Sequence, residues 1–194
     1  MLKKTLILFL FAFLASCTKY KLSDEDLKCV PYNGNEKLYF KSSYGDVDSF
    51  ILDKPDRYFS EVYSHKLIDF DNFEIVDFYF TRGKPDSSFY SPLVRLQAAD
   101  DDIPFLTIYL IAKDAKLEPE YSIGLDEYKK QQTIKLSTAY GSFSDVLIFY
   151  PDATSIDYEK QPEYITKVYW SKSKGLLRFD KKDCYWELSD IKIK

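Results

Sequence analysis

The chain has 194 residues, of which 45% are hydrophobic and 30% charged, and its formal net charge is −4. This length fits one domain of ordinary size behind an N-terminal targeting segment. The acidic balance argues against nucleic acid as a partner, because neutralising phosphates requires a basic surface. The 17 Tyr and 15 Phe favour β-strands, whose pleated and half-buried surfaces suit aromatic side chains.

The first sixteen residues have the three parts of a secretory signal peptide. Lys3 and Lys4 are followed by an apolar run over 5–14 and then by the small residues Ala15 and Ser16. A membrane-spanning helix needs about twenty apolar residues, and this run is only about half as long. We therefore predict that residues 1–16 are a signal peptide, whose removal would take the net charge from −4 to −6.

The sequence "LASC" at 14–17 resembles the lipobox of bacterial lipoproteins. In that family a diacylglyceryl group is added to the cysteine, cleavage makes the cysteine the new N-terminus, and acyl chains such as palmitate hold the protein on the membrane. The resemblance implies that Cys17 is the lipidation site and that the protein is anchored in the cell envelope. We expect the anchor to lie in the outer membrane and make no prediction about which side of that membrane the domain faces. The alternative is a secreted protein that is cut near Ser16.

Residues 17–28 are polar and contain an acidic cluster at 24–26, so we predict a lipidated tether there. The remaining residues, 29–194, are predicted to form a single β-rich domain.

Within this domain, short apolar or alternating runs are separated by turn residues. Residues 37–43 and 48–52 flank a Gly-Asp turn signal and predict a hairpin. The run at 73–82 alternates, with Val76, Phe78 and Phe80 on one face. Further strands are predicted at 103–112, which is apolar on both faces, and at 145–150.

The charged segment 114–132 is interrupted by Pro119 and Gly124. Asp126 could cap a short helix, but no apolar stripe follows that would bury it. We predict a long exposed connection.

The C-terminal region predicts a three-stranded antiparallel meander over 163–171, 175–180 and 184–188. Two sets of side chains are expected to face the core: Tyr164, Thr166, Val168 and Trp170 on the first strand, and Cys184, Trp186 and Leu188 on the last. The predicted fold is all-β, either an antiparallel sandwich or a curved, barrel-like sheet, with little helix.

With Cys17 assigned to lipid, Cys29 and Cys184 remain. Disulfides persist in exported proteins, and a bridge here would close nearly the whole domain. The chain-entropy model gives such a bridge about 4–5 kcal/mol. Two separate free thiols are the open alternative, and a zinc site would need more ligands than this chain readily offers.

Two blocks, 29–52 and 167–188, resemble segments of small lipoproteins from the Bacteroidota. The resemblance covers about a quarter of the chain and implies a lipoprotein. It transfers no catalytic residue.

No catalytic motif is present in the sequence. His65 is the single histidine, and nucleophile elbows, HExxH, phosphate-binding glycine loops and dinucleotide fingerprints are absent. The acidic groups at 69–74 and 100–102 lack the spacing of a calcium-binding loop and are predicted to be turns. We assign no catalytic, cofactor-binding or metal-binding residue.

These observations favour a membrane-anchored, non-enzymatic domain that binds an envelope protein or a small apolar or glycan ligand. One alternative is a structural component of the envelope. The other is an enzyme that acts on glycans through two facing carboxyl groups, one of which would need a raised pKa.

Overall fold

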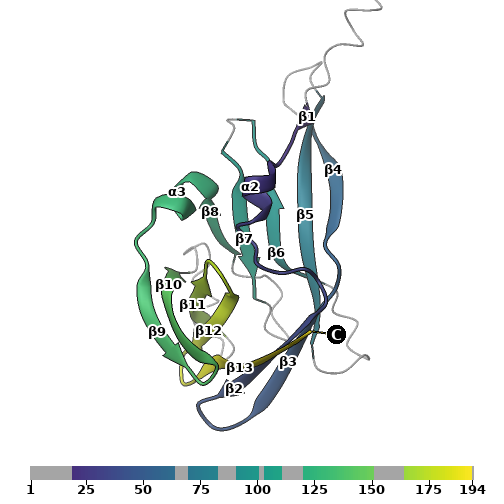
Figure 1. Cartoon of the computed structure of the whole chain (residues 1–194). Helices are drawn as coiled ribbons and strands as arrows, with labels where there is room; N and C mark the ends of the chain where they lie inside the picture. Colours follow the sequence, from purple (N-terminus) through teal and green to yellow (C-terminus); the bar gives the residue numbers. More distant parts are fainter. Residues whose placement is uncertain are drawn as a thin grey trace, which may run out of the picture.

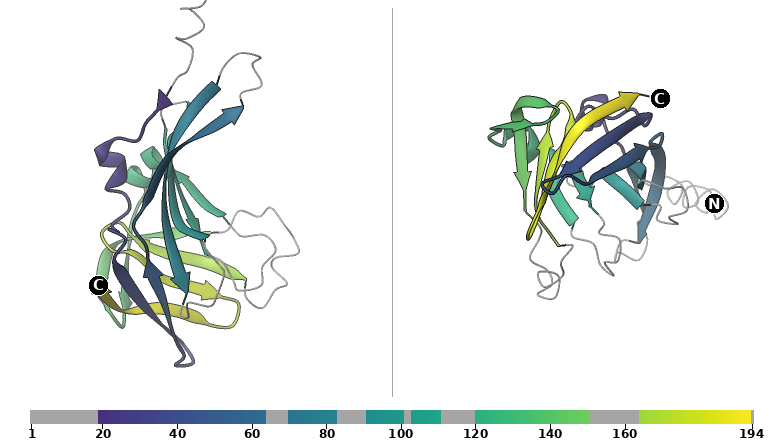
Figure 2. Two further views of the ribbon diagram at one scale, coloured as in Figure 1. Left: turned by 90° about the vertical axis from the view of Figure 1, so that its right-hand side faces the viewer. Right: turned by 90° about the horizontal axis from the view of Figure 1, so that it is seen from below.

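The computed structural model describes residues 19–63, 70–82, 91–100, 103–110, 120–150 and 164–193. These residues form a mostly antiparallel β-sheet that curls strongly into a half-barrel, with little helix (Figures 1 and 2). The predicted all-β, curved-sheet fold is confirmed. The elements are β1 (Lys19–Tyr20), α2 (Asp24–Leu27), β2 (Glu36–Ser42), β3 (Val47–Leu52), β4 (Asp56–Tyr63), β5 (Phe70–Arg82), β6 (Ser91–Gln97), β7 (Phe105–Tyr109), β8 (Glu120–Gly124), α3 (Leu125–Lys130), β9 (Ile134–Thr138), β10 (Gly141–Phe149), β11 (Ile165–Ser171), β12 (Gly175–Lys181) and β13 (Tyr185–Ile193).

The two halves of the chain meet in the middle of the sheet. The strand order is β8-β7-β6-β5-β3-β2-β13-β12-β11-β10-β9, with β4 paired to β5 and β1 paired in parallel to β5. The curl brings strands that are distant in this order together. The Tyr121 hydroxyl on β8, for example, donates a hydrogen bond to the Ile165 carbonyl on β11 at 2.9 Å.

Both predicted local motifs are confirmed. β2 and β3 form the expected hairpin, and β11, β12 and β13 form the expected meander. The last strand runs beyond 188 to Ile193, with a register shift between Leu188 and Asp190 as it pairs with β2.

The predicted inward faces of the meander are only partly correct. Val168, Trp170 and Leu188 are buried, whereas Tyr164, Thr166, Cys184 and Trp186 are only half-buried. The register between β11 and β12 shifts after Ile165, which is itself buried, so a simple two-residue alternation does not hold there.

β5 is buried on both faces. Val76, Phe78 and Phe80 belong to the core, as their alternation predicts. On the opposite face Asp77 is fully buried, where it accepts hydrogen bonds from Arg95 Nε and Nη2 at 2.8 and 2.9 Å and from the Tyr58 hydroxyl at 2.9 Å. A buried carboxylate is tolerated here because it is paired and its oxygens are hydrogen-bonded.

The exposed connection predicted over 114–132 is wrong for the part that the structure describes. Residues 120–130 form β8 and α3, with four buried side chains: Tyr121, Ile123, Leu125 and Tyr128. Their spacing changes from two residues to three where the strand becomes a helix, so neither period is sustained long enough to be recognised.

The polar tether predicted over 17–28 is also incorrect for the residues described, which begin at 19. Lys19 and Tyr20 pair with β5, and Leu22 is buried. Ser23 and Asp26 form a capping box that begins α2, so the acidic cluster is the first turn of a helix. The folded domain therefore starts about ten residues earlier than predicted.

Residues 22–35, here called the N-terminal segment, cover the concave side of the sheet (Figure 2). Tyr32 is buried, packs edge-on against Trp170, and accepts a 2.7 Å hydrogen bond from the Leu176 backbone N–H. The Trp170 indole N–H donates to the Tyr128 hydroxyl, which donates to the Cys29 carbonyl. These bonds attach the N-terminal segment to the C-terminal half of the sheet.

Cys29 and Cys184 are both free thiols, so the structure has the unbridged alternative. Cys29 is buried and its carbonyl accepts a hydrogen bond from the Tyr128 hydroxyl, whereas Cys184 is half-buried and follows the end of β12. Burial raises the pKa of the Cys29 thiol, which keeps it protonated.

Gly34 and Gly45 offer a matched test of the N-terminal segment. Both have positive φ, 79° and 96°, but a Cβ on Gly34 would lie 2.2 Å from the Asp53 carbonyl oxygen, whereas a Cβ on Gly45 meets nothing within 4 Å. We expect Gly45→Ala to cost about 1 kcal/mol of unfolding free energy from backbone strain alone, and Gly34→Ala to cost at least about 3 kcal/mol. Urea denaturation measures both; equal losses would contradict the close approach at Gly34.

Candidate ligand pocket

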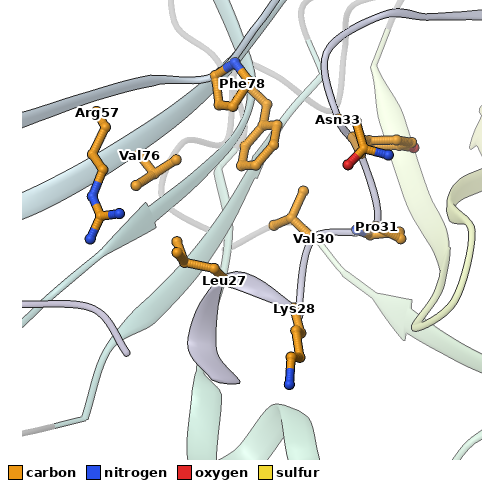
Figure 3. A pocket seen from close by; sticks show the side chains of 10 residues that line it. Leu27, Lys28, Val30, Pro31, Asn33, Arg57, Val76 and Phe78 are labelled. Atoms are coloured by element: carbon orange, nitrogen blue, oxygen red, sulfur yellow. The ribbon is translucent and has the colours of Figure 1, made fainter. Parts of the chain in front are cut away.

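An open pocket of about 680 Å³ lies between the N-terminal segment and the concave face of β4 and β5 (Figure 3). Its volume lies within the range of small-molecule sites in proteins. The lining residues are Leu27, Lys28, Val30, Pro31, Tyr32, Asn33, Pro55, Arg57, Val76 and Phe78.

The walls of the pocket are mainly apolar. Val76 and Phe78 alternate along β5 and face the concave side, and Leu27 and Val30 of the N-terminal segment lie across from them in Figure 3. Because the two walls come from segments about fifty residues apart in the sequence, the pocket exists only when the N-terminal segment is folded onto the sheet.

The N-terminal segment is fixed on both sides of the pocket. Before it, the Leu22 N–H donates to the Glu74 carboxylate, and Lys129 of α3 pairs with Asp26 at 3.1 Å. After it, the Glu36 carboxylate accepts three backbone N–H bonds of 2.7–3.0 Å, from the consecutive residues 33–35. We therefore treat this wall as preorganised.

Arg57 is the cationic group at one end of the pocket (Figure 3). Its side chain is 51% exposed, and its Nε donates to Glu74 Oε1. Within the part of the chain that the structure describes, its two terminal nitrogens carry no further hydrogen bond, so they can donate to a ligand. Lys28, the other cation of the lining, is paired with Glu25 on the surface.

Glu74 is the buried anion of the site, with only 4% of its side chain exposed. Burial alone would raise its pKa, but the hydrogen bonds from Arg57 and from the Leu22 N–H outweigh burial and lower the pKa below its ordinary value. The carboxylate is therefore ionised at neutral pH, and its role is to position Arg57 and Leu22.

The same direction holds for the other carboxyl groups with a shifted pKa in the described part of the chain. Burial would raise the pKa of Asp26 and of Asp145, but serine hydroxyl and backbone donors lower both. A general acid for glycan cleavage needs the opposite shift. Among the described residues, no three His, Cys, Asp or Glu side chains cluster in a way that could hold a metal ion.

Several sequence-predicted positions lie outside the described residues: Cys17, His65, Asp69, Asp101 and Asp102. The turn predicted over 69–74 is wrong from Phe70 onward, because residues 70–74 form the first part of β5. The Glu74 carboxylate in this part of β5 accepts hydrogen bonds from Arg57 and from the Leu22 N–H. The sequence pattern does not identify Arg57 or the N-terminal segment as parts of a site. Of the pocket lining, the pattern indicates only the apolar face that includes Val76 and Phe78.

Within the described ranges, no helix combines the length and hydropathy needed to cross a bilayer. Comparison of the chain with models of known protein families, with curated proteins and with solved structures finds no match.

We predict that Arg57→Met lowers the free energy of unfolding at pH 7 by about 1–2 kcal/mol, because it leaves the buried Glu74 carboxylate without its cation. The loss is no larger because the Arg57 side chain is half-exposed and solvent screens its interaction with Glu74. The folded-state pKa of Glu74 is depressed, so the stabilisation is present above its unfolded-state pKa and is lost as the pH falls through the folded-state value.

Urea denaturation of the parent and of Arg57→Met at several pH values measures this effect. The gap in unfolding free energy between the two proteins should narrow as the pH falls through the range in which the Glu74 carboxyl group becomes protonated. Lys28→Met is the matched control, since its partner Glu25 is exposed, and it should leave stability unchanged. A gap that does not depend on pH would contradict the assigned role of Glu74.

Proposed function

We propose that this protein is a lipid-anchored, non-enzymatic binding domain of the bacterial cell envelope, and that it holds a small ligand in the pocket between the N-terminal segment and β5. The observation that carries the proposal is the pocket itself. It combines apolar walls with two cations, Lys28, which is paired with Glu25, and Arg57, whose terminal nitrogens remain able to donate.

The pocket favours a ligand with an apolar body and an anionic or hydrogen-bond-accepting group. Val76, Phe78 and Val30 provide apolar contact, while a guanidinium group prefers carboxylate or phosphate oxygens. An apolar site with a few polar groups that fix orientation is the usual design of a small-molecule pocket.

The anchor is supported by the signal peptide at 1–16 and by the "LASC" sequence at 14–17. The resemblance of residues 29–52 and 167–188 to small lipoproteins of the Bacteroidota points the same way. Outer-membrane location belongs to the proposal, as does the envelope as the source of ligand or partner.

The anchor is tested with Cys17→Ser in cells that express the whole chain. The parent should fractionate with membranes and carry acyl chains by intact-mass spectrometry, whereas the variant should lose both. Protease treatment of intact cells then reports the side of the membrane. Recovery of the parent in the soluble fraction, without added mass, would refute the lipoprotein assignment.

The pocket is tested with 8-anilinonaphthalene-1-sulfonate, a probe with an apolar body and one anionic group. We expect the folded protein to bind it and Asn33→Trp to weaken binding severalfold, because an indole at the exposed lining position 33 obstructs the pocket. Asn35→Trp is the matched control: Asn35 is also exposed but does not line the pocket.

Both variants should unfold at the urea concentration of the parent, which separates pocket binding from general loosening of the fold. Equal probe affinity in the parent and both variants would place binding elsewhere and refute the proposed site.

A further inference from the structure

The distance between the proposed lipid and the folded domain is very short. The first strand begins at Lys19, two residues after Cys17. Two residues of fully extended chain span at most about 7 Å. The hydrocarbon core of a bilayer is about 30 Å thick and the whole bilayer about 40–45 Å, which leaves about 5–8 Å for each headgroup layer. The chain between lipid and fold can therefore do no more than cross the headgroups.

On this basis, and resting on the proposed lipidation of Cys17, we infer that one end of the sheet lies directly against the membrane. This end, here called the arm, consists of β1 with residues 57–63 of β4 and 70–76 of β5. The occupant of this surface is the headgroup layer of a phospholipid bilayer.

β1, the part of the arm nearest to Cys17 in the sequence, is paired with the sheet and cannot rotate independently of it. Lys19 and Tyr20 pair with Asn72 and Phe73 of β5. The Tyr20 ring stacks on the Phe73 ring at 5.0 Å, and two residues later the Leu22 N–H donates to the buried Glu74 carboxylate. Anchoring at Cys17 therefore fixes the orientation of the domain as well as its distance from the bilayer.

The exposed side chains of the arm suit a headgroup layer. Phe59 on β4 is 42% exposed, and the Lys19 ammonium group lies 5.6 Å from the centre of its ring. Lys21, which directly follows β1, is also exposed. Aromatic rings and lysines with apolar stems are enriched at the membrane interface, and lysines near the surface are attracted to anionic lipids.

The inferred orientation has two structural consequences. The β2–β3 turn, with exposed Tyr44 and Val47, lies at the far end of the molecule from the arm, as Figures 1 and 2 show. Arg57, at one end of the pocket, lies two residues before Phe59 on β4, and two strand residues span about 7 Å. The pocket is therefore held close to the bilayer.

The test uses the acylated mature protein, residues 17–194, in vesicles of phosphatidylethanolamine and phosphatidylglycerol that contain lipids brominated near the glycerol end of the acyl chains. Tryptophan is introduced at Phe59→Trp in the arm and, as the matched control, at Val47→Trp in the distant turn. The unsubstituted protein supplies the background from Trp170, which is fully buried, and Trp186, which is half-buried. We expect the bromines to quench the added emission of Phe59→Trp and to leave that of Val47→Trp unchanged.

A third protein tests the argument from chain length. A flexible Gly-Ser linker of about 20 residues, placed between Thr18 and Lys19, adds a typical reach of about 25 Å. It should keep the acyl chains and lose the quenching at position 59. Intact mass separates the two claims: acylated Phe59→Trp without quenching overturns the membrane-facing arm while the anchor stands, as does equal quenching at position 47. Protein without acyl chains overturns the lipid anchor and the arm with it.

Discussion

The fold depends on covering the concave face of a sheet that does not close. A half-barrel curls its apolar side chains toward a shared interior, and the N-terminal segment fills that interior. Tyr32 is the central contact: its buried ring meets Trp170 and its hydroxyl accepts the Leu176 N–H. Burial raises the pKa of this hydroxyl and keeps it neutral. Without the segment, the core side chains of both halves would face solvent, at a cost that scales with apolar area.

The same segment creates the pocket and connects it to the proposed anchor. One continuous stretch runs from β1 in the arm, through Leu22 and α2, to the pocket wall at Val30 and then into the core at Tyr32. Its polar groups are satisfied by carboxylates at both ends, Glu74 and Glu36. Lipid attachment, pocket formation and core packing therefore depend on a single piece of chain.

Elements with local signals could be predicted from the sequence. The β2–β3 hairpin and the β11–β13 meander have alternating runs separated by turn residues, and these local patterns are sufficient to predict the strands and their antiparallel pairing. The N-terminal segment has no such signal: its polar residues resemble a tether, and what makes it structural is a set of long-range contacts such as Tyr32 with Leu176. The pocket was missed for the same reason, since Arg57 and Val30 become neighbours only through the curl. Asp77 could not be predicted to be buried, because its burial depends on the ion pair with Arg95, a residue on a different strand.

Native-state hydrogen exchange of the backbone amides in the N-terminal segment and its partners tests the account most directly. The N–H groups of Leu22 and Leu176 donate to Glu74 and Tyr32 respectively, and these long-range bonds exist only if the segment is folded onto the sheet. The N–H of Gly34 donates to Glu36 in the turn that leads into β2. We predict that these amides open with free energies close to those of the central strands β2 and β13. Exchange at the rate of an unstructured peptide, while β2 and β13 stay protected, would show that the segment is a free tether and would remove the basis for the pocket.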